Sequence, residues 1–103
     1  MRTIAEIRRQ LMVGDFEFSQ HAFRRAVERN ISESEIREAG ESAQVIEDYP
    51  ADKYSPSCLL LGFTRGNRAL HLQVSRAETE LTKIITLYEP TKDEWYADLT
   101  RRR

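Results

Sequence analysis

The spacing of apolar residues changes near residue 43, and this change limits the possible fold more than any other feature of the sequence. Ile4, Ile7 and Leu11 recur at the spacing of an amphipathic helix, and helical signals continue to about residue 40. From residue 43 onward the apolar residues form short or alternating runs of strand length. Helices followed by strands are typical of an α+β domain with an antiparallel sheet.

Capping residues divide the helical part into three helices. The predicted helices span residues 2–13, 20–29 and 33–39. Ser19 is a good N-cap for the second helix, and Ser32 with Glu35 forms a capping-box pattern before the third. We expect Gly40 to end the third helix, and Phe16–Phe18 to be a short extended link between the first two.

Four strands are expected in the second part of the chain. They span residues 43–48, 57–64, 68–74 and 81–88. Arg65-Gly66-Asn67 has the composition of a hairpin turn between the second and third of them. Since the 103 residues show no repeat and no linker, we predict one domain over 1–103. Its N-terminal helices would pack on a four-stranded antiparallel sheet.

Charge and composition exclude several classes of protein. The net charge is −1, divided as +2 over residues 1–30, −5 over 31–60 and +2 over 61–103. The chain therefore lacks the overall basic charge of many nucleic-acid-binding domains, and RNA binding would need a local cluster. No stretch approaches the roughly 18 apolar residues of a membrane helix. A single cysteine and an N-terminus without a signal-peptide pattern predict a cytoplasmic protein without a membrane partner.

A polar stripe runs along the second predicted helix. His21, Arg25 and Arg29 are four residues apart, so their side chains share one face, with Arg24 on the same polar arc. Arginine binds two phosphate oxygens at once, and histidine transfers protons near neutral pH. The pattern is therefore typical of a site for a phosphate ester. A solvated helix face explains the same pattern without any function.

A second candidate group lies in the strands. Alternation in the run Ala69 to Val74 places His71 opposite the apolar face that its neighbours form. Thr86 and Tyr88 share one face of the last strand and would join His71 if the two strands are adjacent. The alternative is that His71 is a surface histidine and that threonine and tyrosine are simply good strand formers.

Other chemistry is not indicated. The two histidines are 50 residues apart and show no metal-ligand spacing, and no glycine-rich loop could cradle a phosphate. We therefore expect neither a metal nor a cofactor. Cys58 lies in an apolar strand, where it packs as a small hydrophobe. Tyr54, Trp95 and Tyr96 could stack on bases, although a small domain also needs aromatic residues in its core.

Several blocks of the sequence resemble a known family. They are FSQHAFRRAVERNIS, VIEDYP, SPSCLLLGFTRGNRALHLQVS and IITLYEP, with Trp95 close behind. In this order they are similar to the small bacterial proteins called domain of unknown function 4258. The likeness covers about residues 16–95.

The resemblance implies the toxin of a toxin–antitoxin pair, with RNA as substrate and an antitoxin, often a zinc-finger protein, as partner. It also implies a RelE/barnase-like ribonuclease architecture. The implied catalytic positions are His21, Arg25, His71, Thr86 and Tyr88. The predicted RNA-binding positions are Arg29, which also fits the helix block of the family, and Arg24 on the same polar arc.

These parts lead to the hypothesis of a metal-independent endoribonuclease. His21 and His71 would share the acid and base roles, in an order that the sequence does not assign, while Arg25 stabilises the phosphate. Arg29 would steer RNA, and Thr86 or Tyr88 would position the phosphate. This hypothesis requires both histidines to share a cleft. The competing hypotheses are a non-enzymatic interaction module, whose acidic segment 33–52 suits a basic partner, and a toxin that has lost its activity.

Overall fold

The structure is a computed structural model that describes residues 1–53 and 55–103. Tyr54, which was one of the candidate base-stacking residues, lies outside the described residues. The elements are α1 (Ile4–Val13), β1 (Phe16–Phe18), α2 (Gln20–Glu28), α3 (Glu33–Ser42), β2 (Gln44–Tyr49), β3 (Ser57–Phe63), β4 (Ala69–Ser75) and β5 (Thr82–Tyr88). The helices and the four longer strands lie within a few residues of their predicted positions. The mixed α+β class is thereby confirmed.

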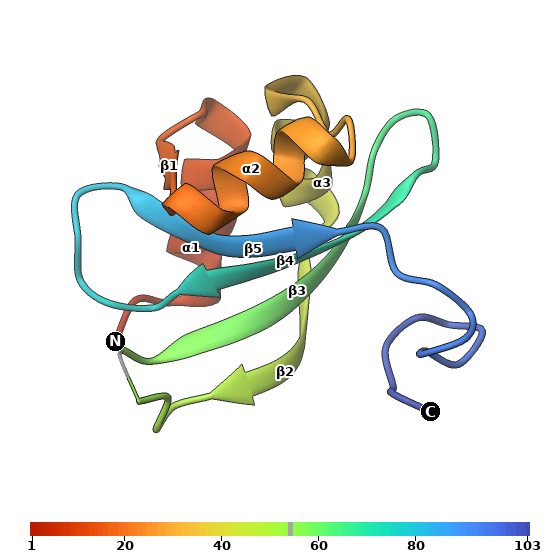
Figure 1. Cartoon of the computed structure of the whole chain (residues 1–103). Coiled ribbons are helices and arrows are strands. Elements are labelled where there is room, and N and C mark those ends of the chain that lie inside the picture. The colour runs from red at the N-terminus through yellow and green to blue at the C-terminus, as the bar shows by residue number, and fades with distance from the viewer. Residues whose placement is uncertain (54) are drawn as a thin grey trace.

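The strands form one sheet in the order β1-β5-β4-β3-β2. All three helices cover one face of this sheet, and the chain after β5 turns toward the opposite side (Figure 1). The pairs β2–β3, β3–β4 and β4–β5 are antiparallel, as predicted. The helices, from the first half of the sequence, therefore form one layer. The sheet, mostly from the second half, forms the other.

The prediction of four strands is wrong, because Phe16–Phe18 is a fifth strand. β1 pairs parallel with β5, with Phe16 opposite Thr82 and Phe18 opposite Ile84. Three residues are too few to show a period-2 pattern that differs from an extended link. Because the pairing uses backbone groups and a partner 66 residues away, it leaves no local signal in the sequence.

The core lies between the helices and the sheet. Its fully buried members include Ile7, Leu11, Ile36, Leu60, Leu70, Leu72, Val74, Ile84 and Leu87. Cys58 is buried among them, as expected for a small hydrophobe, and this burial raises the pKa of its thiol to about 11. The apolar residues of β4 thus face the helices, which leaves the alternate residues of that strand on the other face.

The predicted caps are present. The Ser19 side chain accepts from the Ala22 N–H, and Ser32 and Glu35 form the full capping box. Gly40, however, does not end α3, which continues to Ser42. A Cβ at Gly40 would lie 2.5 Å from the Leu11 Cβ. Glycine at this position therefore allows α1 and α3 to pack closely, and it does not act as a stop.

The C-terminal segment, residues 90–103, contains no helix or long strand and bonds to itself. The Tyr96 N–H donates to the Arg101 carbonyl at 2.9 Å, and the Arg103 N–H donates to the Glu94 carbonyl at 2.9 Å. Leu99, with a φ of 63°, lies at the turn of this loop. Trp95 is 1% exposed. The segment is thus a small ordered unit, anchored by a buried tryptophan.

Candidate functional site

His71 lies on the face of the sheet that the helices do not cover. Its neighbours Leu70 and Leu72 point into the core, so His71 points the other way. In the register of β4 and β5, His71 is directly opposite Tyr88, and Gln73 is opposite Thr86. The structure therefore brings Tyr88 and Thr86 to the His71 side of the sheet. Tyr88 contacts the histidine, and Thr86 lies one row away.

The C-terminal segment buries His71 completely. The Trp95 ring stands edge-on to the imidazole at a centroid distance of 4.3 Å, and the Leu99 carbonyl oxygen lies 2.8 Å from His71 Nε2. His71 has no exposed surface. Burial lowers the pKa of His71, although the bond to Leu99 and the nearby Glu47 carboxylate act in the opposite direction. The imidazole is therefore neutral at pH 7.

The hydrogen bonds of His71 determine its tautomer. A carbonyl oxygen can only accept, so Nε2 carries the hydrogen and donates it to Leu99. In the neutral ring Nδ1 is then an acceptor, and the Tyr88 hydroxyl, 3.3 Å away, donates to it. The result is a chain of three groups: Tyr88 hydroxyl, His71 ring and Leu99 carbonyl. In this chain the imidazole is oriented to take a proton from the phenol.

An ion pair on the same face holds the C-terminal segment to β2. Arg102 donates from Nε and Nη2 to the Glu47 carboxylate at 2.9 and 3.1 Å, and its Cζ lies 4.6 Å from the centroid of the Trp95 ring. The Tyr49 hydroxyl also donates to Glu47. Burial acts to raise the pKa of Glu47, but these bonds outweigh it, and the pKa is lowered. Glu47 is thus a charged anchor for Arg102.

A pocket of about 390 Å³ opens beside Tyr88. Its lining residues are Arg29, Tyr88, Glu89, Thr91, Glu94 and Trp95. Arg29 reaches it from the end of α2, donates from Nη1 to the Leu87 carbonyl at 2.8 Å, and holds its Cζ 6.0 Å from the Tyr88 ring centroid. Two residues singled out in the sequence, Arg29 and Tyr88, thus come together from elements 59 residues apart. This pocket is the candidate site.

Arg68 joins the elements around the pocket. It donates to the Arg29 carbonyl at 2.9 Å, to the Glu35 carboxylate at 3.1 Å and to the Glu89 carboxylate at 2.6 Å. One guanidinium therefore fixes the end of α2, the start of α3 and the residue after β5. Because the Glu89 carboxylate is paired in this way, it contributes little net charge to the pocket.

The two carboxylates that line the pocket differ in their partners. No described residue forms a hydrogen bond or an ion pair with the Glu94 side chain, whereas Glu89 is bound by Arg68. Glu94 nevertheless lies near Tyr88, since both line the pocket. The charge of Glu94 is therefore one of several influences on the pKa of the phenol. Burial is the largest of these influences and raises the pKa of Tyr88. The phenol therefore keeps its proton at neutral pH.

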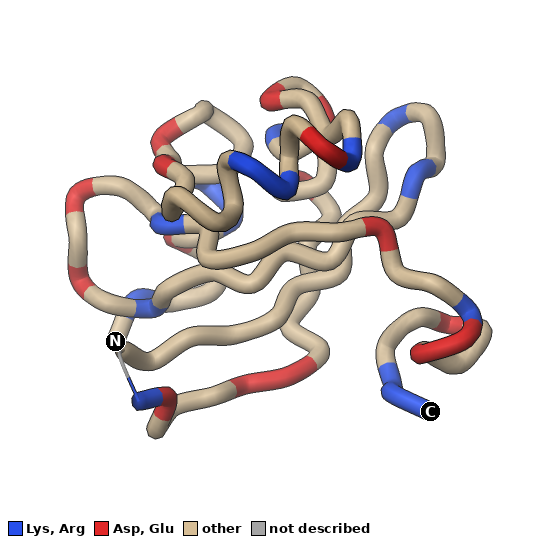
Figure 2. Tube along the Cα trace, in the orientation of Figure 1, with Lys and Arg blue, Asp and Glu red and all other residues tan. Residues whose placement is uncertain are grey.

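The remaining predicted residues lie elsewhere. His21, Arg24 and Arg25 are on α2 away from the pocket, and Arg25 pairs with Glu28 at 2.8 Å on an exposed surface. Figure 2 shows basic residues in succession along α2, followed by acidic and basic residues at its end. These side chains form a solvated face in this structure. Their predicted roles in catalysis and RNA binding remain predictions.

The structure does not bring the two histidines together. α2 packs Ala22 and Ala26 into the core on the helix side of the sheet, and His71 lies on the other side. His21 is exposed, and none of the pockets found among the described residues is lined by both histidines. A shared cleft, which the two-histidine hypothesis requires, is therefore not formed.

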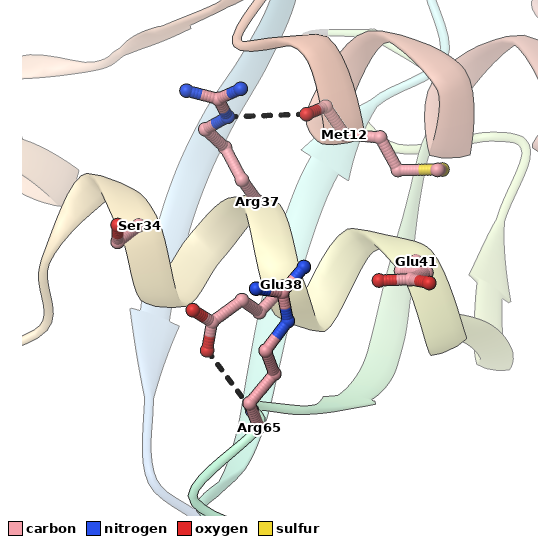
Figure 3. Close-up of a pocket in the computed structure, with 6 residues that line it drawn as sticks. All are labelled: Met12, Ser34, Arg37, Glu38, Glu41 and Arg65. Carbon is pink, nitrogen blue, oxygen red and sulfur yellow. Dashed lines mark hydrogen bonds between the residues drawn. The ribbon is translucent and has the colours of Figure 1, made fainter.

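A second pocket, of about 460 Å³, lies between α1, α3 and the turn after β3. Figure 3 shows its charged residues. The Arg37 Nε donates to the Met12 carbonyl at 3.1 Å, and the Glu38 carboxylate accepts from the Arg65 N–H at 3.0 Å. Two arginines and two glutamates line this pocket and offset each other, and it contains no residue predicted for a site. We do not take it as the candidate site.

Sequence reasoning missed Glu47, Arg68, Glu94 and the position of Trp95. Strict alternation in 43–48 could have placed Glu47 on the face opposite the helices, but the bulge between Val45 and Glu47 breaks the period. Arg68 was expected to begin the strand over 68–74 but lies just before β4, and Glu94 lies in the irregular C-terminal segment, where no period exists. No sequence signal could have found them.

Within the described ranges no group of three or more His, Cys, Asp or Glu side chains could hold a metal ion. None of the described helices has the length and apolarity that a bilayer crossing requires.

A protein-family model matches most of the chain. The family model described as "Domain of unknown function (DUF4258)" matches residues 18–89. The matched range includes Arg29, His71 and Tyr88 and stops before Glu94 and Trp95. Comparisons with curated proteins and with solved structures found no match.

Proposed function

Because the chain belongs to the DUF4258 family, whose description names no activity, we propose its function from the pocket: it is a metal-independent endoribonuclease. The observation that carries this proposal is the meeting of Arg29 with the Tyr88–His71 pair. RNA cleavage by the 2′-hydroxyl needs a group that takes a proton and a cation for the charge that grows on the phosphate. Both are present at this pocket.

Tyr88 and His71 supply the proton transfer in this proposal. The 2′-hydroxyl gives its proton to the Tyr88 oxygen as the phenolic proton moves to His71 Nδ1. The 2′-oxygen then bonds to phosphorus, a cyclic 2′,3′-phosphate forms, and the bond from phosphorus to the 5′-oxygen breaks. The 5′-oxygen takes up a proton from water, and the hydroxide so formed takes the proton of His71 back through the Tyr88 hydroxyl, which restores the neutral ring. Tyr88 touches the substrate, and His71 acts through it, so His71 is a positioning residue held by the Leu99 carbonyl.

Arg29 supplies the positive charge. Its Nη1 is bound to the Leu87 carbonyl, which fixes the side chain, while its Nε and Nη2 donors form no hydrogen bond within the described part of the chain. A guanidinium with free donors can bind two phosphate oxygens. A fixed cation beside a partly buried phenol is the arrangement that stabilises charge in a transition state.

The broader setting of this function follows from the family resemblance. We infer a toxin of a toxin–antitoxin pair with a RelE/barnase-like architecture, acting in the cytoplasm and bound by an antitoxin, often a zinc-finger protein. Helices on one face of a largely antiparallel sheet support this architecture. Fold alone does not imply activity. The proposal therefore depends on the pocket.

The test is cleavage of a labelled RNA with EDTA present. We expect the protein to cleave it, Tyr88→Phe to lower the rate by about 10²-fold, and Arg29→Gln to lower it by a similar factor. Tyr96→Phe and Arg9→Gln are the matched controls, because each makes the same chemical change on an exposed residue that does not line the pocket. Equal rates for Tyr88→Phe and Tyr96→Phe would refute the proposal.

A second candidate function is a non-enzymatic interaction module. Phe23 and Val27 on α2 are 58% and 66% exposed, and large apolar side chains with such exposure often mark protein contacts. A double variant, Phe23→Ser with Val27→Ser, would then lose binding to the protein encoded beside this one. If the unmodified protein also leaves RNA intact, the interaction module replaces the enzyme.

A further inference from the structure

We propose that the pocket beside Tyr88 binds a guanine base and that Glu94 recognises it. This inference rests on the proposed function, because it identifies which nucleotide of an RNA the enzyme would hold. It adds a specificity residue, Glu94, that lies outside the region matched by the family model.

The size and walls of the pocket suit one flat ring system. Its volume of about 390 Å³ is near the lower end of the roughly 300–1,000 Å³ that is usual for small-molecule sites. Tyr88 is half-buried and presents an aromatic ring, on which any nucleobase can stack. Trp95 lines the pocket but is 1% exposed and packed against His71 and Arg102, so it offers no free ring face. The Tyr88 ring therefore favours a base, without selecting which one.

Charge in and around the pocket favours a neutral occupant. Arg29 and Arg68 offset Glu89 and Glu94, and Arg68 is already bound to Glu89. If a phosphate group entered the pocket itself, the carboxylates of Glu89 and Glu94 would repel it. If a lysine or arginine side chain of a protein partner entered, Arg29 would repel it. A neutral base with its own phosphate held by Arg29 meets neither difficulty.

The free carboxylate of Glu94 selects guanine among the bases. Two adjacent carboxylate oxygens accept two parallel N–H groups. Guanine presents such a pair, N1–H and N2–H, on its Watson–Crick edge. Adenine, cytosine and uracil each place an acceptor beside their donor, so one Glu94 oxygen would face a lone pair. Glu89 cannot take this role while Arg68 occupies it.

The test uses the fluorescence of Trp95, which is the only tryptophan of the chain. The four ribonucleoside 3′-monophosphates are titrated into the full-length protein, with absorbance corrected against free N-acetyltryptophanamide. The phosphate is common to all four, so differences between them report the base. We expect guanosine 3′-monophosphate to bind about ten-fold more tightly than adenosine 3′-monophosphate, as one bidentate contact implies.

Two variants test the role of Glu94. Glu94→Gln replaces one acceptor with a donor, so we expect the guanine preference to disappear. Glu80→Gln makes the same change on an exposed side chain just before β5, at the opposite end of that strand from Tyr88, and we expect it to keep the preference. Because both side chains are exposed, both variants should fold, which circular dichroism checks. A preference that survives in Glu94→Gln would overturn the inference.

Other outcomes separate this inference from the proposed function. Guanine preference without RNA cleavage keeps the base site and refutes the enzyme. RNA cleavage without a guanine preference refutes the base site and keeps the enzyme. Absence of nucleotide binding refutes both. Tighter binding of arginine amide than of guanosine 3′-monophosphate would assign the pocket to a cationic side chain of a protein partner, and would also overturn the inference.

Discussion

Gly62→Ala is expected to destabilise the protein, because α3 lies directly against β3 at this residue. A Cβ at Gly62 would lie 2.2 Å from the Ala39 carbonyl oxygen and 2.8 Å from the Ala39 carbonyl carbon. Ordinary contacts of a Cβ begin near 3.4 Å. The atoms that it meets belong to a backbone in the middle of a helix, so they cannot rotate away as a side chain would.

The magnitude follows from this overlap. Overpacking in a core costs about 1–3 kcal/mol, while replacing glycine with alanine restricts the unfolded chain and offsets about 0.4–1 kcal/mol. Because the overlap is with backbone atoms, the cost lies near the upper end, at about 3 kcal/mol, and after an offset of about 1 kcal/mol we expect the free energy of unfolding to fall by about 2 kcal/mol. For a domain of this size each kcal/mol corresponds to about 4–8 °C, so the melting temperature should fall by about 8–16 °C.

The measurement is urea and thermal unfolding followed by circular dichroism. Gly66→Ala is the matched control, because its Cβ would meet only the Thr64 hydroxyl oxygen, at 3.7 Å, and its φ is not in the left-handed region. We expect this control to stay within about 0.5 kcal/mol of the unmodified protein. If Gly62→Ala were as stable as Gly66→Ala, the close packing of α3 on β3 would be refuted.

Two further predictions concern buried titratable groups. Because burial lowers the pKa of His71 below its ordinary 6.5, the unfolded chain binds the proton more tightly, so stability should fall as pH drops from 6.5 toward 5. His21→Gln should keep this slope in urea unfolding, and a flat profile would contradict a buried neutral imidazole. Cys58, with no exposed surface and a pKa of about 11, should react with a thiol reagent only in denaturant; rapid reaction of the native protein would contradict its burial.

Local patterns in the sequence were sufficient to predict most of the fold. Ser19 and Ser32 cap helices because each supplies an oxygen to an N–H three residues on, which is a contact within the reach of local sequence. β1 escaped prediction because its partner is distant and its length gives no period. Gly40 was misread as a stop because the sequence does not show that Leu11 lies against it.

The candidate site was less predictable than the fold. The alternation of apolar residues correctly predicted that His71 points away from the core. It could not show that a segment from the end of the chain would bury His71. His21 and Arg25 had the right spacing on a helix whose polar face points to solvent. Arg29, on the same stripe, lies one turn further along and reaches Tyr88. The spacing of residues therefore identifies the polar face of a helix. Only the packing of α2 against the sheet determines which residues of that face lie near the sheet.

The C-terminal segment closes its own loop, so it can leave the sheet as one piece. Its amides at Tyr96, Leu99 and Arg103 donate within the segment, whereas its bonds to the sheet are confined to side chains such as those of His71 and Glu47. In hydrogen exchange we therefore expect the segment to open as a unit, at a lower free energy than the β3–β4 ladder. Such an opening would expose His71 to solvent while the sheet stays folded.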